Sequence, residues 1–205
     1  MADGGTQIKR GRKFDQVLDG ARKIFMSDGY EGASVDDVAK AAEVSKATLY
    51  SYFPDKRLLF MEVARLECCR QTEHALESID MTQPVRDVLC NMCQHMMKFF
   101  LSPFGQRVFR ICVAESDRFP ELGREFYASG PEHVAASIMS YFDDAIDRGE
   151  LQIKDRHLAA HQLIELCKAD LFPRLVFGID TEFSDEEINN VVTGAVDMFL
   201  ARYGV

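Results

Sequence analysis

Residues 34–53 read SVDDVAKAAEVSKATLYSYF, a pattern that indicates two short helices joined by a tight turn. Ser34 stands three residues before Asp37, which is the capping-box spacing expected at the start of a helix. Three apolar residues then recur at helical spacing: Val38, Ala39 and Ala42. Because Ala39 is small, a second helix can cross close to the first at this point.

The second helix of this stretch begins after Val44, where Ser45 can cap its free amide groups. Leu49 and Phe53 lie four residues apart, so both can face inward. The other faces carry side chains suited to a DNA groove: Lys46, Ala47, Thr48, Tyr50, Ser51 and Tyr52. A helix-turn-helix requires one braced helix and one helix that presents hydrogen-bonding side chains, and both are present.

The motif SKATLYSYFPDKRLLF, together with the amphipathic stretch FDQVLDGARKIFMSDGYEGAS upstream of it, resembles the amino-terminal domain of TetR-family (AcrR-like) transcriptional regulators. The resemblance covers residues 11–63. After residue 63 it rests on chain length and helical pattern. It implies an all-α protein with a three-helix, helix-turn-helix DNA-binding domain at residues 1–54. It further implies a ligand-binding and dimerisation domain of roughly six helices at residues 55–205.

Helical periodicity continues through the rest of the chain, and no strong strand-and-turn pattern appears. A fourth helix is expected from Asp55 to about Ile79, after Pro54 ends the helix before it. Ser184 and Glu187 have the spacing of a second capping box. Further helices are expected at residues 82–101, 104–115, 119–149 with an interruption at Gly130 and Pro131, 155–178 and 184–203.

The chain has 205 residues, of which 47% are hydrophobic, so it can bury a substantial core. No apolar run approaches the ~18 residues of a membrane span. The first residues, MADGGTQIKRGRKF, lack the apolar segment of a signal peptide. These features predict a cytoplasmic protein with no membrane partner.

Net charge is -9, but the excess acid lies outside the predicted DNA-binding region. Residues 1–62 hold ten Lys and Arg against ten Asp and Glu, while the remainder holds 24 − 10 = 14 basic and 33 − 10 = 23 acidic residues. Four basic residues crowd the amino terminus: Lys9, Arg10, Arg12 and Lys13. They form either an arm that reaches DNA phosphates or a solvated terminus.

A two-fold dimer with two such helices would read an inverted-repeat operator in adjacent major grooves. Lys46 can donate to guanine and Ala47 can touch a thymine methyl group. By the family resemblance, Lys56 lies beside the DNA backbone and Tyr50 and Tyr52 contact phosphate and groove. The full predicted DNA-binding set is Ser34, Ser45, Lys46, Ala47, Thr48, Tyr50, Ser51, Tyr52 and Lys56. Glu43 departs from the glycine common in this turn, which costs on the order of 1 kcal/mol in a left-handed conformation.

The carboxy-terminal region is rich in Met and Phe, which fits an adaptable cavity for an apolar or aromatic effector. The same residues at helical spacing also suit an ordinary core. The predicted effector-binding residues are Met96, Phe100, Phe109, Phe142, His161, Glu165 and Phe172. The family resemblance implies a homodimer that pairs the last two long helices, at residues 155–178 and 184–203.

No pattern of catalytic residues appears, and neither a cofactor nor a metal ion is expected. Cys90 and Cys93 have a C-x-x-C spacing, but no second pair of ligands accompanies them, so two buried thiols are the simpler interpretation.

These observations together predict a ligand-responsive dimeric repressor. The alternative is a TetR-like protein that binds a lipid or another hydrophobe and no longer binds DNA. An acidic or apolar recognition helix would mark that alternative, whereas this helix retains Lys46, Thr48 and Tyr50. An enzyme is the weakest interpretation, because nothing supplies a nucleophile with its base.

Overall fold

The computed structural model describes residues 11–117 and 119–205, which are all-α. The only extended pairing among them is an isolated bridge between Leu151 and Gly204. We call residues 11–54 the head and residues 55–205 the body. The head contains α1 (Arg12–Gly32), α2 (Val35–Ala41) and α3 (Lys46–Tyr52). The body contains α4 (Lys56–Ser78), α5 (Val85–Leu101), α6 (Pro103–Glu115), α7 (Pro120–Ser129), α8 (Pro131–Asp147), α9 (Arg156–Cys167), α10 (Leu171–Val176) and α11 (Asp185–Tyr203).

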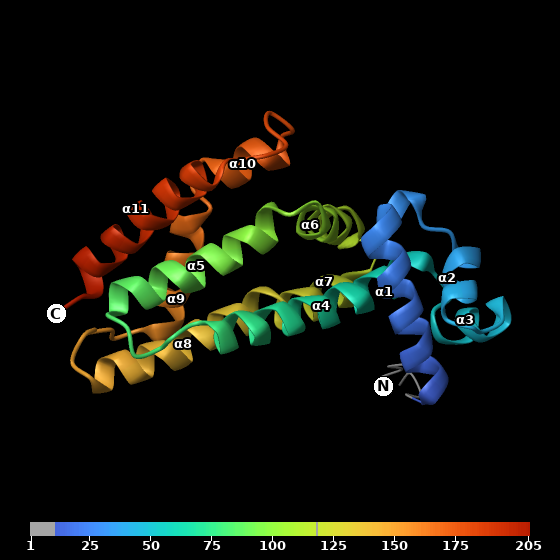
Figure 1. The fold of residues 1–205 in the computed structure, drawn as a ribbon, viewed down its shortest axis with the longest axis horizontal. Coiled ribbons are helices and arrows are strands. Elements are labelled where there is room, and N and C mark those ends of the chain that lie inside the picture. The colour runs from blue at the N-terminus through green and yellow to red at the C-terminus, as the bar shows by residue number, and fades with distance from the viewer. Residues whose placement is uncertain (1–10, 118) are drawn as a thin grey trace.

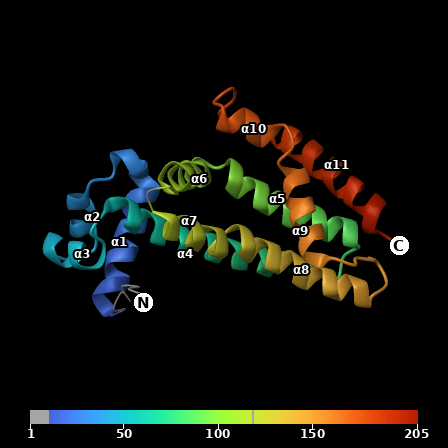
Figure 2. The same cartoon turned by 180° about the vertical axis from the view of Figure 1, so that it is seen from behind.

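The molecule is elongated, with the head at one end and the body extending away from it (Figure 1). Helix α4 leaves the head and runs along the body, where α7 packs against it. Helices α5, α9 and α11 lie at the other end of the body, and the carboxy terminus lies far from the head (Figure 2). The body is therefore connected to the head through α4 and through α6, which also contacts α1.

The short helices of the head begin at side-chain caps that the sequence predicts. The hydroxyl of Ser34 accepts from the amide of Asp37 at 3.1 Å, and that of Ser45 accepts from the amide of Thr48 at 3.1 Å. Each cap satisfies an amide that the helix itself leaves unpaired. The predicted capping box at the start of α11 is also present, with the hydroxyl of Ser184 accepting from the amide of Glu187 at 3.2 Å.

A close approach of α1 to α2 holds the head together. A Cβ added to Gly20 would lie 2.6 Å from the amide nitrogen of Ala42, so only glycine fits at this crossing. Leu49 of α3 and Phe53, which directly follows that helix, are buried in the same core, as predicted, and Phe53 stacks on Phe14 at 5.4 Å between ring centroids.

The core of the head does not stop at the predicted boundary between residues 54 and 55. Leu59, Phe60 and Ala64 from α4 pack with the residues of α1, and Val108 and Cys112 from α6 join them. The two regions therefore share one hydrophobic cluster, although the boundary itself stays a prediction.

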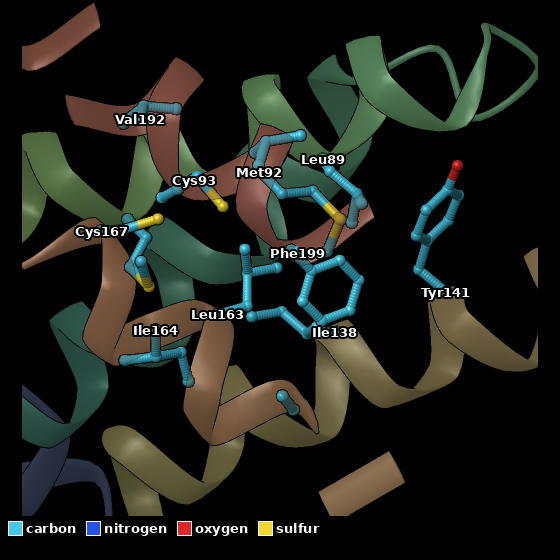
Figure 3. Packing of buried hydrophobic residues seen from close by; sticks show 14 of the residues in the cluster. Leu89, Met92, Cys93, Ile138, Tyr141, Leu163, Ile164, Cys167, Val192 and Phe199 are labelled. Carbon is cyan, nitrogen blue, oxygen red and sulfur yellow. The ribbon is translucent and has the colours of Figure 1, made fainter. Parts of the chain in front are cut away.

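The core of the body is built from α5, α8, α9 and α11, helices that are far apart in the sequence. Figure 3 shows Leu89 and Met92 of α5 meeting Ile138 of α8 and Leu163 of α9. In the same core Phe142 of α8 stacks on Phe199 of α11 at 5.2 Å between centroids.

The single helix predicted at residues 155–178 is wrong, because it is divided into α9 and α10. Helix α9 ends at Cys167, and Asp170 takes a φ of 64° before α10 begins. Pro173 explains the break, since a proline inside a helix removes an amide donor and collides with the carbonyl four residues earlier. The described part of the body accordingly has eight helices rather than about six.

Among the described residues, no helix combines the length and the apolar character needed to cross a membrane.

Candidate nucleic-acid interface and adjoining cavity

Helix α3 is anchored on one side and presents its other side to solvent. Leu49 is 1% exposed, whereas Tyr50 is 47% exposed. Ala47 and Ser51 are exposed as well, and Ser51 donates to the carbonyl of Thr48 at 2.6 Å. The predicted contact residues of α3 thus share one accessible polar surface, of the kind that a helix-turn-helix places in a major groove.

Lys46, the first residue of α3, has a partner that the sequence did not suggest. Its ammonium group forms an ion pair with Asp36 of α2, and both side chains are more than half exposed. Asp36 therefore partly neutralises the cation that is expected to reach DNA. No short-range spacing predicts this pair, because it depends on how α2 crosses α3.

Two other predicted contacts also have packing roles. The ammonium of Lys56 lies 4.4 Å from the ring centroid of Tyr30, a cation–π contact that fastens the start of α4 to the end of α1. Tyr52 packs edge-on against Phe14 at 5.6 Å between centroids and is half-buried. These residues both shape the surface and can contribute to it.

The turn between α2 and α3 confirms the strained position predicted from the sequence. Glu43 has a φ of 54°, in the left-handed region that favours glycine. The turn closes through the amide of Val44, which donates to the carbonyl of Ala39 at 3.0 Å. Ser34 remains exposed and donates to the carboxylate of Asp37 in addition to its capping bond.

The predicted basic arm falls mostly beyond the structural description. Lys9, Arg10 and the side chain of Arg12 lie outside the described residues, while Lys13 is exposed on the first turn of α1. The contribution of the arm to DNA binding stays a prediction.

A cavity of about 960 Å³ lies where the head meets the body. The end of α1 supplies Phe25 and Tyr30 to its wall, so the cavity reaches the core of the head. Aromatic and sulfur-containing side chains dominate the part of the wall that comes from the body: Phe60, Met92, Met96, Phe99, Phe100 and Phe104. Helix α8 closes one side with Val134, Ser137 and Ile138.

Basic side chains accompany this apolar lining. His95, Lys98 and Arg107 line the cavity, and Arg107 contacts Glu31 of the head at 3.3 Å. Burial, together with the neighbouring Lys98 and His74, lowers the pKa of His95 below its ordinary value. The cavity thus combines an apolar lining with polar groups of both signs, since Asp28 and Glu31 line it beside Lys98 and Arg107, and it suits an aromatic or aliphatic molecule that carries a polar group.

The predicted effector-binding residues are distributed over several places. Met96 and Phe100 line the cavity, and their part in effector binding stays a prediction. Phe109 and Phe172 pack against each other at 5.2 Å between centroids, outside its lining. Phe142 belongs to the core of the body.

The two polar members of the predicted set also lie elsewhere. Glu165 is exposed and forms an ion pair with Lys168 at 2.5 Å, and His161 lies beside Glu132. Phe25 and Phe60 also line the cavity but are absent from the predicted set. Phe25 lies on α1 of the head and Phe60 lies on α4.

Four cysteines, Cys68, Cys90, Cys93 and Cys112, lie in surroundings that keep them protonated. Burial raises the pKa of Cys68 and of Cys112 to about 12. Cys93 is fully buried, and its thiol interacts with Cys167 of α9 rather than pairing with Cys90, so its pKa is raised well above the ordinary value. Cys90 also has a raised pKa because of burial. A thiolate is the form that binds metals and attacks disulfides, and these surroundings disfavour it.

One buried ion pair joins the head to α4. Nε of Arg22 donates to Oε2 of Glu67 at 2.7 Å, and Glu67 is only 4% exposed. Burial opposes ionisation of Glu67, but hydrogen bonds from Arg22 and Gln71 outweigh it, so the pKa of Glu67 is lower than usual. This contact joins α1 of the head to α4, and α4 also borders the cavity.

Known proteins resemble the chain in both regions. The family described as “Bacterial regulatory proteins, tetR family” matches residues 17–63, and the family described as “AefR-like transcriptional repressor, C-terminal domain” matches residues 87–205. The uncharacterized HTH-type transcriptional regulator YhgD of Bacillus subtilis is 26% identical over 160 residues, which are 76% of this chain and 81% of YhgD.

Two solved structures resemble the whole fold. A crystal structure of a TetR-family transcriptional regulator from Mesorhizobium loti has a TM-score of 0.77 and 29% identity, over 95% of this chain and 98% of that one. The flavonoid-responsive regulator FrrA has a TM-score of 0.68 and 30% identity, with the same coverage of both chains.

Proposed function

The chain belongs to the TetR family of transcriptional regulators, and we propose that it is a dimeric repressor released from DNA by a small apolar or aromatic effector. Its operator is an inverted repeat, read in the major groove by α3 of each subunit. The cytoplasm, where the DNA lies, is its place of action.

The observation that carries this proposal is the position of the cavity. Its wall includes Phe25 and Tyr30 from the head as well as Phe60 from α4. Lys56, which begins α4, contacts the same Tyr30 ring. An effector in the cavity therefore touches the parts that set the angle between the head and the body. A difference of only ~1–3 kcal/mol between the two states is enough for regulation.

The chemistry of the cavity supports the effector class. Its aromatic and Met-rich lining favours a flat or flexible apolar molecule, and charged side chains of both signs in that lining can bind a polar group on that molecule. FrrA, one of the similar structures, responds to flavonoids, which agrees with an aromatic effector here.

An exposed face of α11 supports the homodimer. Small or apolar residues lie along it at helical spacing: Gly194, Met198 and Ala201. Met198 is 63% exposed, and Leu158 of the neighbouring α9 is 51% exposed. Exposed apolar side chains on adjacent helices suit a helix-to-helix contact with a second copy. In such a dimer the two α3 helices would meet major grooves ~34–36 Å apart.

Footprinting tests the proposal directly. Purified protein is incubated at two salt concentrations with the DNA upstream of its own gene and of the neighbouring genes. A protected inverted repeat is expected, with affinity that falls steeply as salt rises because bound phosphates release counterions. Adding hydrophobic molecules that carry a polar group, with flavonoids among the first, should release the DNA.

Substituting Lys46 by Ala identifies the surface that binds. The change should cost ~1–3 kcal/mol of operator affinity, as expected for a side chain that contacts a base or a phosphate. Lys154→Ala is the matched control, because Lys154 is exposed on the loop before α9 and its loss changes net charge equally. Equal affinities for both variants would remove Lys46 from the site.

The alternative function is hydrophobe binding without DNA recognition. The observation in its favour is the acidity around α3, where Asp36, Asp37 and Glu43 are all exposed. Absence of any protected site, combined with tight binding of a hydrophobic ligand, would support this alternative and contradict the repressor.

A further inference from the structure

A cluster of one carboxylate and two imidazoles lies away from both the DNA-binding surface and the lining of the cavity. His157 and His161 stand four residues apart on α9, so they project from the same face of that helix. Their rings lie 4.5 Å apart between centroids. Glu132, in the first turn of α8, faces both of them.

The distances within the cluster match those between ligands of one metal ion. Nε2 of His157 lies 3.4 Å from Oε1 of Glu132, and Nε2 of His161 lies 3.6 Å from Oε2. Zinc binds imidazole nitrogen and carboxylate oxygen at roughly 2.0–2.2 Å, so two ligands at a tetrahedral angle are ~3.4 Å apart. One ligand atom from each residue lies within 4.8 Å of the others.

Ordinary hydrogen bonding does not account for this arrangement. Nε2 of His161 is covered from solvent and makes no hydrogen bond within the described part of the chain. Both contacts to Glu132 are longer than the 2.7–3.2 Å of a normal N–H···O bond. A buried nitrogen without a partner costs free energy, and coordination to a cation removes that cost.

We propose that Glu132, His157 and His161 form a binding site for one zinc ion. Two imidazoles and one carboxylate are the donor types that zinc selects, whereas magnesium and calcium prefer oxygen alone. The side chain of His157 is 59% exposed, so solvent reaches the site and water can fill a fourth position. This inference concerns binding at α8 and α9, and it stands independently of the proposed repressor activity.

The ion would join two helices that the fold packs together. Glu132 follows Gly130 and Pro131 directly, and Gly130 and Val134 line the cavity at the same end of α8. Zinc would therefore tie the start of the helix that closes the cavity to α9.

The test uses the full chain, freed of metal with a chelator and then titrated with zinc against a chromogenic chelator. We expect one zinc per chain, an increase in the unfolding temperature on adding zinc, and no competition from magnesium. Cobalt then serves as a spectroscopic probe. Imidazole and carboxylate ligands give visible d–d bands without the charge-transfer band of a thiolate, which distinguishes this site from the six cysteines.

Single substitutions locate the ion. His157→Ala should weaken zinc binding by more than about tenfold, since even the loss of a group that only orients a ligand costs roughly 10–100-fold. His157 is largely exposed, so this variant is expected to keep its fold, which circular dichroism checks. Glu132→Gln removes the charged ligand at nearly constant size. His74→Ala is the matched control, because it deletes an exposed histidine of α4.

The outcomes divide clearly. Stoichiometric binding that is lost in His157→Ala and Glu132→Gln but kept in His74→Ala supports the site. Absence of stoichiometric binding, an unchanged affinity in the two ligand variants, or a thiolate charge-transfer band overturns it. Failure here would leave operator binding untouched, because none of these residues belongs to the head.

Discussion

The centre of the head and the junction between head and body differ in how closely their helices pack. In the head, α1 approaches the backbone of Ala42 so closely that only Gly20 fits between them. Where the head meets the body, helices of both regions instead line a cavity of about 960 Å³. Tight packing at the centre of the head suits a recognition helix that must keep one shape, while space at the junction can accept a small molecule.

This difference in packing indicates which part of the molecule a bound effector can displace. A packed core resists small displacements and transmits them, whereas a cavity wall can move with what fills it. Phe60 belongs to both regions, since it contacts Phe25 and Tyr30 of the head at 5.1 and 5.0 Å between centroids and also lines the cavity. The transmission from effector to DNA is thus expected to pass through this aromatic group.

The largest expected effect comes from comparing one truncation in each region. Leu49→Ala, in the packed head, should lower the free energy of unfolding by about 2–5 kcal/mol. Phe99→Ala, on the wall of the cavity, should cost less than half as much, because a side chain that faces empty space has fewer contacts to lose. Urea unfolding of both variants measures the difference. Equal costs would mean that the cavity wall is as tightly packed as the head.

A smaller effect is expected at the ion pair that joins the two regions. Arg22→Ala leaves Glu67 buried without its main partner, which should cost about 1–3 kcal/mol at neutral pH. Arg70→Ala is the control, since Arg70 lies 3.8 Å from the same carboxylate and is more exposed, and it should cost less than about 0.5 kcal/mol.

The pH dependence of the same variant sharpens this prediction. The pKa of Glu67 is lowered by folding, so its stabilising contribution is present above the unfolded pKa of about 4.3 and is lost as pH falls through the folded pKa. The stability gap between the native protein and Arg22→Ala should therefore narrow below about pH 4. A gap that stays constant in acid would show that Arg22 acts through packing rather than through charge.

The smallest expected effect concerns the DNA-binding surface alone. Asp36→Asn frees Lys46 from its ion pair, so operator affinity should rise by roughly two- to fivefold, the range of a surface pair worth about 0.5–1 kcal/mol. Asp147→Asn, at the far end of α8, is the control for the change in net charge. Titration of labelled operator DNA gives both affinities. A decrease in affinity for Asp36→Asn would mean that Asp36 positions Lys46 productively.

Local chemistry made the head predictable. Ser34, Ser45 and Asp55 cap three successive helices, and each acts on an amide only two or three residues away. The strain at Glu43 could likewise be anticipated, because the turn needs a left-handed residue and the chain places glutamate there. Such interactions depend on spacing along the chain, which sequence displays directly.

The body was harder to anticipate for two different reasons. Pro173 indicates a break between α9 and α10. The strongly apolar composition of residues 155–178 nevertheless favoured the prediction of one continuous helix. The pairing of Cys93 with Cys167 and the meeting of Glu132 with two histidines are of another kind, since neighbouring helices bring these residues together from distant parts of the chain. The sequence shows that His157 and His161 are four residues apart and can share one helix face. No pattern in the sequence, however, identifies Glu132 as the third residue of their cluster.

By itself, the sequence determined an all-α chain with a capped helix-turn-helix, an inward face of Leu49 and Phe53, and membership of the TetR family, which the matches to both regions establish. Only the tertiary structure decided that Asp36 holds Lys46, that Phe25 and Phe60 border the cavity, and that Glu132 reaches α9. Caps and apolar stripes act within one or two helical turns and therefore leave a periodic trace in the sequence. Cavities and long-range ion pairs arise from the angles at which helices cross, and those angles depend on the packing of many side chains at once.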